Sequence, residues 1–224
     1  MQNHHLQVVK PPTGIIIYDG PSTMTGERII CVATSFQRSQ NRKTGNVIQT
    51  WILLADQHPQ EALDEGADDS ICGNCKHREF RSCYVNMAHG PAHVYRAWKR
   101  GTYEYASPPS LYWFKDKFVR LGSYGDPTAV PIDIWDEVCG ISGSWTGYTH
   151  QWKKCDPVYK KYCMASCDTY DETVRARKLG WRPFYVRGRD ERAGKDMFIC
   201  PASTELDRNK DVTCAKCNQC SGGE

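Results

Sequence analysis

Three cysteines near the C-terminus, Cys214, Cys217 and Cys220, follow one another with two residues between neighbours. A C-x-x-C-x-x-C run suits three corners of a [4Fe–4S] cubane, as in bacterial-type ferredoxins, where the fourth ligand comes from elsewhere in the chain. Cys200 precedes Pro201, and a remote Cys-Pro ligand is also typical of ferredoxins. We therefore expect Cys200, Cys214, Cys217 and Cys220 to hold an iron–sulfur cluster, with zinc on the same thiolates as the alternative.

A second group of cysteines, Cys72, Cys75 and Cys83, lies earlier in the chain. Three thiolates can hold a cubane with one iron left open for a substrate or cofactor, so this group is a second candidate metal site. The alternatives are a zinc site completed by His77, His89 or another cysteine, and a group that binds no metal. The spacing does not distinguish iron–sulfur from zinc.

The chain has twelve cysteines in 224 residues, which is a high count. A secreted disulfide scaffold is disfavoured, because the polar start of the chain predicts no signal peptide and disulfides between C-x-x-C neighbours would be strained. Metal-bound thiolates in a reducing cytoplasm fit better. Cys31 and Cys139 fall in predicted regular elements, and we expect them to be buried free thiols.

The composition is that of an ordinary globular protein, with 40% hydrophobic residues and a net charge of +3. This mild basicity permits a nucleic-acid partner without requiring one. Aromatic and basic residues alternate from Tyr95 to Lys115, a pattern that suits single-stranded nucleic acid but also an amphipathic helix with its cations in solvent. No apolar stretch approaches the roughly 20 residues of a membrane span, so we expect no membrane partner.

The pattern of elements predicts an α/β fold, a partial β/α barrel of parallel strands with an N-terminal antiparallel β meander and a cysteine-rich C-terminal tail. We expect a β-rich extension over 1–57 and a β/α metal-binding domain over 58–224, forming one compact unit. The predicted strands are 15–18, 28–36, 47–55, 118–121, 144–149, 162–166, 182–187 and a short one after 197, and the predicted helices include 59–65, 129–139 and 169–179.

Polar residues follow the predicted parallel strands, where sites form in α/β proteins. Asp126, His150 and Asp168 are candidate catalytic residues, Arg187 is a candidate cofactor-binding residue, and with Cys200 they would converge on one mouth. Each also has a local interpretation: Asp126 shapes a turn before a proline, Asp168 caps a helix, and His150 is a satisfied buried histidine.

Five segments of the chain together carry a resemblance to known proteins: Ser70 to Cys75, Ser82 to Val85, Leu121 to Pro127, Gly147 to Trp152 and Cys200 to Ser203. They resemble an uncharacterised family of cysteine-rich proteins encoded mainly by bacteriophages. The similarity covers most of the chain from about residue 40. That family is loosely similar to radical-SAM-like proteins, which combine a partial β/α barrel with cubane clusters.

The resemblance implies an iron–sulfur protein of the infected host's cytoplasm, in the form of a radical-SAM-like or redox enzyme with an unknown substrate. The radical-SAM signature C-x-x-x-C-x-x-C is absent, and Gly222-Gly223-Glu224 stands at the wrong place for that superfamily's SAM contact, so no motif supports SAM. The alternatives are a non-catalytic iron–sulfur protein, structural or electron-carrying, and a zinc-binding module for nucleic acid or protein. The sequence does not decide whether the protein is an enzyme.

Overall fold

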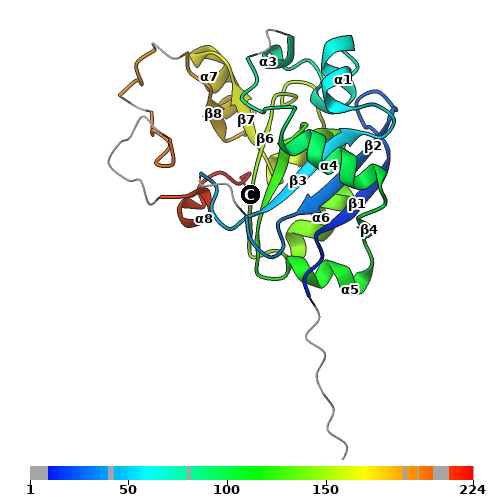
Figure 1. The fold of residues 1–224 in the computed structure, drawn as a ribbon. Coiled ribbons are helices and arrows are strands. Elements are labelled where there is room, and N and C mark those ends of the chain that lie inside the picture. The colour runs from blue at the N-terminus through cyan, green and yellow to red at the C-terminus, as the bar shows by residue number, and fades with distance from the viewer. Residues whose placement is uncertain are drawn as a thin grey trace, which may run out of the picture.

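A single eight-stranded sheet forms the centre of the molecule in the computed structural model (Figure 1). The structure describes residues 10–39, 43–79, 82–188, 191–195, 197–203 and 212–223. The strand order is β4-β1-β2-β3-β5-β6-β7-β8. The α/β class predicted from the sequence is therefore confirmed, while the sheet is open and does not close into a barrel.

The N-terminal part of the sheet is the antiparallel meander that the sequence predicts. It contains β1 (Gly14–Pro21), β2 (Arg28–Thr34) and β3 (Ile48–Leu54), and β1 pairs with β2 and β2 with β3 in antiparallel register. A short strand, β4 (Glu104–Tyr105), extends the sheet beyond β1. Because β3 also pairs with β5, the meander shares one sheet with the rest of the chain.

The other half of the sheet consists of parallel strands added one after another in a single direction across the sheet. It contains β5 (Phe118–Tyr124), β6 (Ser144–Thr149), β7 (Met164–Cys167) and β8 (Pro183–Tyr185). β5 lies beside β3, and each later strand lies beside the strand that precedes it in the chain. All of their pairings, and that of β3 with β5, are parallel. The carboxyl ends of β5, β6 and β7 therefore lie at one edge of the sheet.

Short helices connect and cover the strands. Among them, α1 and α4 contact β3, and Figure 1 shows α4 in front of the sheet. The sequence predicts the bounds of α1, and it places α6 and α7 with a shift of one to three residues at their ends. The helices are α1 (Pro59–Glu65), α2 (Asp69–Cys72), α3 (Lys76–Glu79), α4 (Gly90–Lys99), α5 (Pro108–Leu111), α6 (Ile132–Ile141), α7 (Tyr170–Lys178) and α8 (Cys214–Cys217), with 3-10 turns η1 (Tyr112–Phe114), η2 (Pro127–Ala129) and η3 (Pro157–Lys161).

The core follows the central strands, whose side chains are buried on both faces of the sheet. Ile29, Ile30 and Val32 of β2 and Ile52 and Leu53 of β3 have no exposed surface. Consecutive buried residues of this kind are expected where both faces of a sheet are covered. One prediction fails here: residues 197–203 form no strand, so the short strand predicted after residue 197 is wrong for that part of the tail.

A glycine turn after β5 directs the chain toward the carboxyl edge of the sheet. Gly125 has a φ of +80°, in the left-handed region that other residues adopt only at a cost. A Cβ at this position would lie 2.7 Å from the Cβ of Ile52 and 3.0 Å from its carbonyl oxygen. The turn therefore needs glycine both for its backbone angle and for the close approach to β3.

We predict that Gly125→Ala lowers the free energy of unfolding by at least about 1 kcal/mol, because it adds left-handed strain to a steric clash in the core. Urea denaturation monitored by circular dichroism measures the change. Gly140→Ala is the matched control: Gly140 lies in α6 with open space around it, and alanine there should stabilise the helix by up to about 1 kcal/mol. Equal effects of the two substitutions would contradict this account of the turn.

Candidate functional site

Three of the predicted site residues follow directly after neighbouring parallel strands. Asp126 lies just beyond β5, His150 directly follows β6, and Asp168 directly follows β7. The parallel pairing of β5 with β6 and of β6 with β7 brings these three positions to one edge of the sheet, as the pattern of strands predicts.

Asp126 ties two of these strand ends together. One carboxylate oxygen accepts hydrogen bonds from the backbone N–H and the hydroxyl of Thr128, at 3.0 and 2.8 Å. The other accepts from the Thr149 hydroxyl at 3.0 Å and from the His150 N–H at 2.9 Å. Burial raises the pKa of Asp126, and these four donors oppose that rise. The carboxylate is thus occupied by structural contacts, and it orients the backbone at His150.

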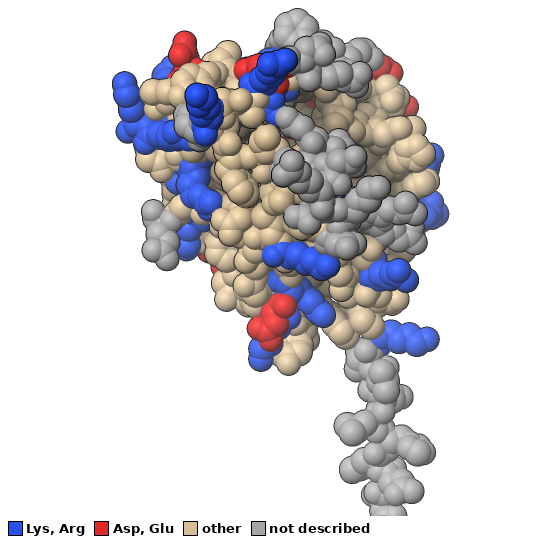
Figure 2. Space-filling model, turned by 90° about the vertical axis from the view of Figure 1, so that its left-hand side faces the viewer, with Lys and Arg blue, Asp and Glu red and all other residues tan. Residues whose placement is uncertain are grey.

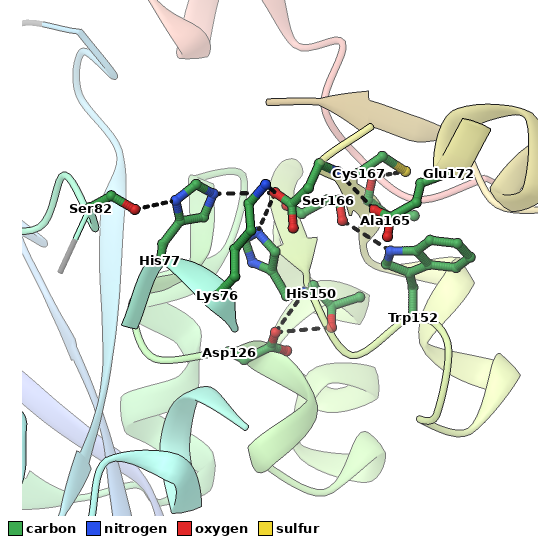
Figure 3. A network of polar contacts seen from close by, with 12 residues as sticks. Lys76, His77, Ser82, Asp126, His150, Trp152, Ala165, Ser166, Cys167 and Glu172 are labelled. Carbon is green, nitrogen blue, oxygen red and sulfur yellow. Dashed lines mark hydrogen bonds and ion pairs between the residues drawn. The ribbon is translucent and has the colours of Figure 1, made fainter. Parts of the chain in front are cut away.

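His77, His150 and Asp168 converge on one point beyond the strand ends (Figure 3). The Nε2 atom of His77 lies 3.3 Å from Oδ1 of Asp168, and Nε2 of His150 lies 3.8 Å from the same oxygen. The two imidazole rings meet edge to face, with centroids 5.4 Å apart. Burial lowers the pKa of His150, against the attraction of the Asp126 and Asp168 carboxylates.

Neighbouring groups hold two of these three residues in place. The hydroxyl of Ser82 lies 2.8 Å from Nδ1 of His77, whereas the Nε2 atom of the same ring lies near Asp168. The backbone N–H of Asp168 donates to Glu172 at 2.8 Å, and Lys153 pairs with the same glutamate. Glu172 thus anchors the start of α7. The predicted N-cap role belongs to Thr169, whose hydroxyl accepts from the Glu172 N–H, and Asp168 stands one position earlier.

The sequence did not place His77 in this cluster. His77 was considered only as a zinc ligand beside Cys72 and Cys75, because those cysteines are its neighbours in the chain. Its observed partners come from two other loops, after β6 and β7. No periodicity or spacing indicates that α3 would reach those strand ends.

The first cysteine group lies close to this cluster but does not join it. Burial raises the pKa of Cys72 well above its usual range, and the neighbouring Asp68, Cys75, Asp126 and Cys83 raise it further. The Cys72 carbonyl accepts a hydrogen bond from the Gln151 amide at 3.0 Å, which joins this loop to the end of β6.

The four tail cysteines also come together. Cys200, Cys214, Cys217 and Cys220 all line one small cavity of about 10 Å³, together with side chains that include Phe118 and Thr146. Burial raises the pKa of both Cys214 and Cys220, and the other cysteines of the group add to the rise. The four residues that the sequence groups together thus border one small cavity, and their role as ligands stays a prediction.

Backbone contacts fasten the tail to the sheet. The Cys220 carbonyl accepts from the Gly147 N–H at 3.2 Å and from the Thr146 hydroxyl at 2.9 Å. At the other end of the run, the Cys214 N–H donates to the Lys43 carbonyl in the loop before β3. Arg182 donates to the Gln219 and Ser221 carbonyls at 2.8 and 2.9 Å. The tail thus lies against β6 and the loop between β2 and β3.

The sequence predicts that Asp126, His150, Asp168, Arg187 and Cys200 lie together at one opening of the fold, and this is only partly observed. Cys200 lines the tail cavity with Phe118, the first residue of β5, whereas Asp126 and His150 lie beyond the opposite ends of the strands. Arg187 and Cys200 both line a larger cavity, to which Asp126 and His150 do not contribute. The reason is that the chain after β8 turns back along the sheet, which a prediction based on strand ends alone does not include.

The larger cavity has a volume of about 870 Å³ and lies beside the tail cysteines. Cys200, Cys217 and Cys220 contribute to its lining, as do residues of β8 and α7. Its basic and aromatic lining residues include Arg177, Arg187, Trp181, Tyr185 and Phe198. Figure 2 shows the side of the molecule that carries α7 and β8, where most of the visible charged side chains are Lys or Arg.

The two isolated cysteines and the aromatic and basic stretch occupy ordinary positions in the fold. Cys31 and Cys139 are buried, as expected. In the aromatic and basic stretch, Tyr95 packs into the core while the Lys99 ammonium lies over the Trp98 ring. This is the arrangement of an amphipathic helix. In the part of the chain that the structure describes, no helix combines the length and apolar character needed to cross a membrane.

Comparison with known proteins gives no relative: no family model, no curated protein and no solved structure matches the chain.

We predict that Asp126→Ala lowers the free energy of unfolding by at least about 3 kcal/mol, because it leaves the buried N–H groups of Thr128 and His150 without an acceptor. Urea denaturation measures the change. Asp133→Ala is the matched control, since Asp133 is an exposed residue of α6, and its loss should change stability by only about 0.5 kcal/mol. If Asp126→Ala lowered the free energy of unfolding no more than the control does, the hydrogen bonds of Asp126 would not hold the ends of β5 and β6 together.

Proposed function

We propose that the chain is an iron–sulfur protein whose cluster is held by Cys200, Cys214, Cys217 and Cys220. The observation that carries the proposal is that these four thiols, three from the tail run and one from beyond it, line a single cavity. Thiolates are the ligands that iron–sulfur clusters use in proteins. The cluster would cross-link Cys200 to the run at 214–220, beside Phe118 of β5 and Thr146 of β6, which line the same cavity.

The spacing of the tail run along the chain favours a cluster over a single zinc ion. Zinc sites commonly use pairs of C-x-x-C that chelate one tetrahedral ion. The run of Cys214, Cys217 and Cys220 has two residues between neighbours, which suits three corners of a cubane.

The adjoining cavity favours a redox enzyme over an electron carrier. Three of the four proposed ligands, Cys200, Cys217 and Cys220, also line the cavity of about 870 Å³. A bound molecule there would be close to the cluster, and the cavity is within the usual range for small-molecule sites. Arg177 and Arg187 give its wall a positive charge that suits an anionic substrate or cofactor. S-adenosylmethionine is the cofactor that the resemblance to radical-SAM-like proteins implies, and no motif of the chain supports it.

The proposal has two further parts. Cys72, Cys75 and Cys83 form a second candidate centre, supported by the C-x-x-C spacing of the first two and the third cysteine that follows in the same part of the chain. The resemblance to cysteine-rich phage proteins adds the proposal that this protein acts in the cytoplasm of an infected cell. Zinc in the tail, with a role in binding nucleic acid or protein, is the alternative that the same residues allow.

Anaerobic purification followed by iron, sulfide and zinc analysis tests the tail cluster. We predict that Cys217→Ala loses about four iron and four sulfide per chain relative to the unsubstituted protein, because one thiolate ligand of the cubane is gone. Cys155→Ala is the matched control, since Cys155 is a partly exposed cysteine outside both groups, and it should keep the full iron and sulfide content. Zinc without sulfide, or unchanged iron in Cys217→Ala, would overturn the proposal.

A further inference from the structure

Three polar side-chain atoms beyond the ends of β6 and β7 are buried yet have no hydrogen-bond partner among the described residues. They are Nε2 of His77, Nε2 of His150 and Oδ1 of Asp168. Each unpaired buried group costs about 1–3 kcal/mol, so such groups need an explanation. These three are not scattered: they lie within 4.8 Å of one another and face a common point (Figure 3).

Contacts among the three residues do not satisfy them. The two Nε2 atoms lie 3.3 and 3.8 Å from the Asp168 oxygen, but neither contact forms a hydrogen bond. Two imidazole rings compete here for one carboxylate oxygen. A cation placed between the three atoms would satisfy all of them at once.

The spacing suits a transition-metal ion. Metal–nitrogen and metal–oxygen bonds of about 2.0–2.2 Å place neighbouring ligand atoms about 3–3.5 Å apart in tetrahedral or octahedral geometry. The distance from His77 to Asp168 already lies in this range, and the distance from His150 to Asp168 exceeds it by a few tenths of an ångström. Two imidazoles and one carboxylate are a ligand set that proteins use for catalytic zinc and for non-haem iron.

The surroundings of His77 and Asp168 are those of metal ligands. A histidine that binds metal through Nε2 carries its proton on Nδ1 and donates it to a neighbour, and Ser82 is placed 2.8 Å from Nδ1 of His77 to accept it. Glu172 accepts from the backbone of Asp168 at 2.8 Å. Outer contacts of this kind fix the orientation of ligands before the metal arrives.

We propose that His77, His150 and Asp168 form a mononuclear site for a divalent first-row transition-metal ion, separate from both cysteine groups. Three protein ligands leave coordination positions open, as in catalytic rather than structural sites. The site lies beyond the carboxyl ends of parallel strands, where α/β proteins bind their ligands. It does not depend on the tail cluster, because none of its ligands is a cysteine.

Lys76 is a charged neighbour whose ammonium group opposes the binding of a metal cation. Its ammonium nitrogen lies 3.4 Å from the same Asp168 oxygen, and the side chain is 41% exposed. An exposed lysine can withdraw into solvent when the cation binds. Lys76→Met should therefore tighten metal binding several-fold, because it removes the repulsion between the ammonium and the metal.

Manganese is the probe that separates this site from the thiols. Mn²⁺ prefers nitrogen and oxygen ligands, whereas thiolates select zinc, copper(I) and iron–sulfur clusters. In a titration followed by electron paramagnetic resonance of free Mn²⁺, we predict one site per chain in the purified protein. Asp168→Asn and His77→Gln should each weaken it by about 100-fold or more, and Zn²⁺ should displace the bound Mn²⁺.

Two exposed residues provide matched controls. Asp171→Asn changes a carboxylate three positions from Asp168, and His93→Gln changes a histidine on the surface of α4. Both variants should bind Mn²⁺ as the unsubstituted protein does. The proposal is overturned if the protein binds no Mn²⁺ or Zn²⁺ beyond the level of Asp168→Asn and His77→Gln, or if the controls lose binding equally. Circular dichroism of each variant shows whether a loss of Mn²⁺ binding is caused by unfolding. The iron and sulfide contents of the variants should equal those of the unsubstituted protein, which shows that the loss of Mn²⁺ binding is independent of the tail cluster.

Discussion

The buried carboxylate of Asp126 is the contact on which the carboxyl edge of this molecule depends. It accepts from the Thr128 N–H and hydroxyl after β5, and from the Thr149 hydroxyl and the His150 N–H at the end of β6. Ionised acceptors bind such donors strongly, and a buried site increases the cost of losing them. The Asp126 carboxylate therefore sets where His150 stands, and thereby the geometry that His150 shares with His77 and Asp168.

The two candidate centres use opposite ends of the same strands. Beyond the carboxyl ends, loops after β6 and β7 meet α3 around His77, His150 and Asp168. Toward the amino ends, the tail lies across Phe118 and Thr146 and gathers four cysteines. The donor sets differ in chemical character, since imidazole and carboxylate suit single divalent ions whereas thiolates suit iron–sulfur clusters. One sheet can in this way hold two metals without competition for the same ligands.

Sequence patterns predicted which residues follow the parallel strands, but they did not predict contacts made by segments outside those strands. The alternation of short apolar strands with helices led to the parallel half of the sheet, and the tail spacing led to four cysteines that share a cavity. His77 was missed because its partners are about seventy residues and more away in the chain, and only the packing of α3 brings them together. Cys200 was assigned to the wrong end of the strands, because strand-end rules do not foresee a tail that folds back.

Native mass spectrometry of the anaerobically purified protein tests the central claim most directly, because it measures the mass of the chain together with any bound metal or cluster. The account predicts a species heavier than the chain by the mass of an inorganic iron–sulfur cluster, with a further single metal ion after incubation with Mn²⁺ or Zn²⁺. A chain that carries zinc alone, or no inorganic sulfide at any occupancy, would contradict the claim that the tail cysteines hold an iron–sulfur cluster.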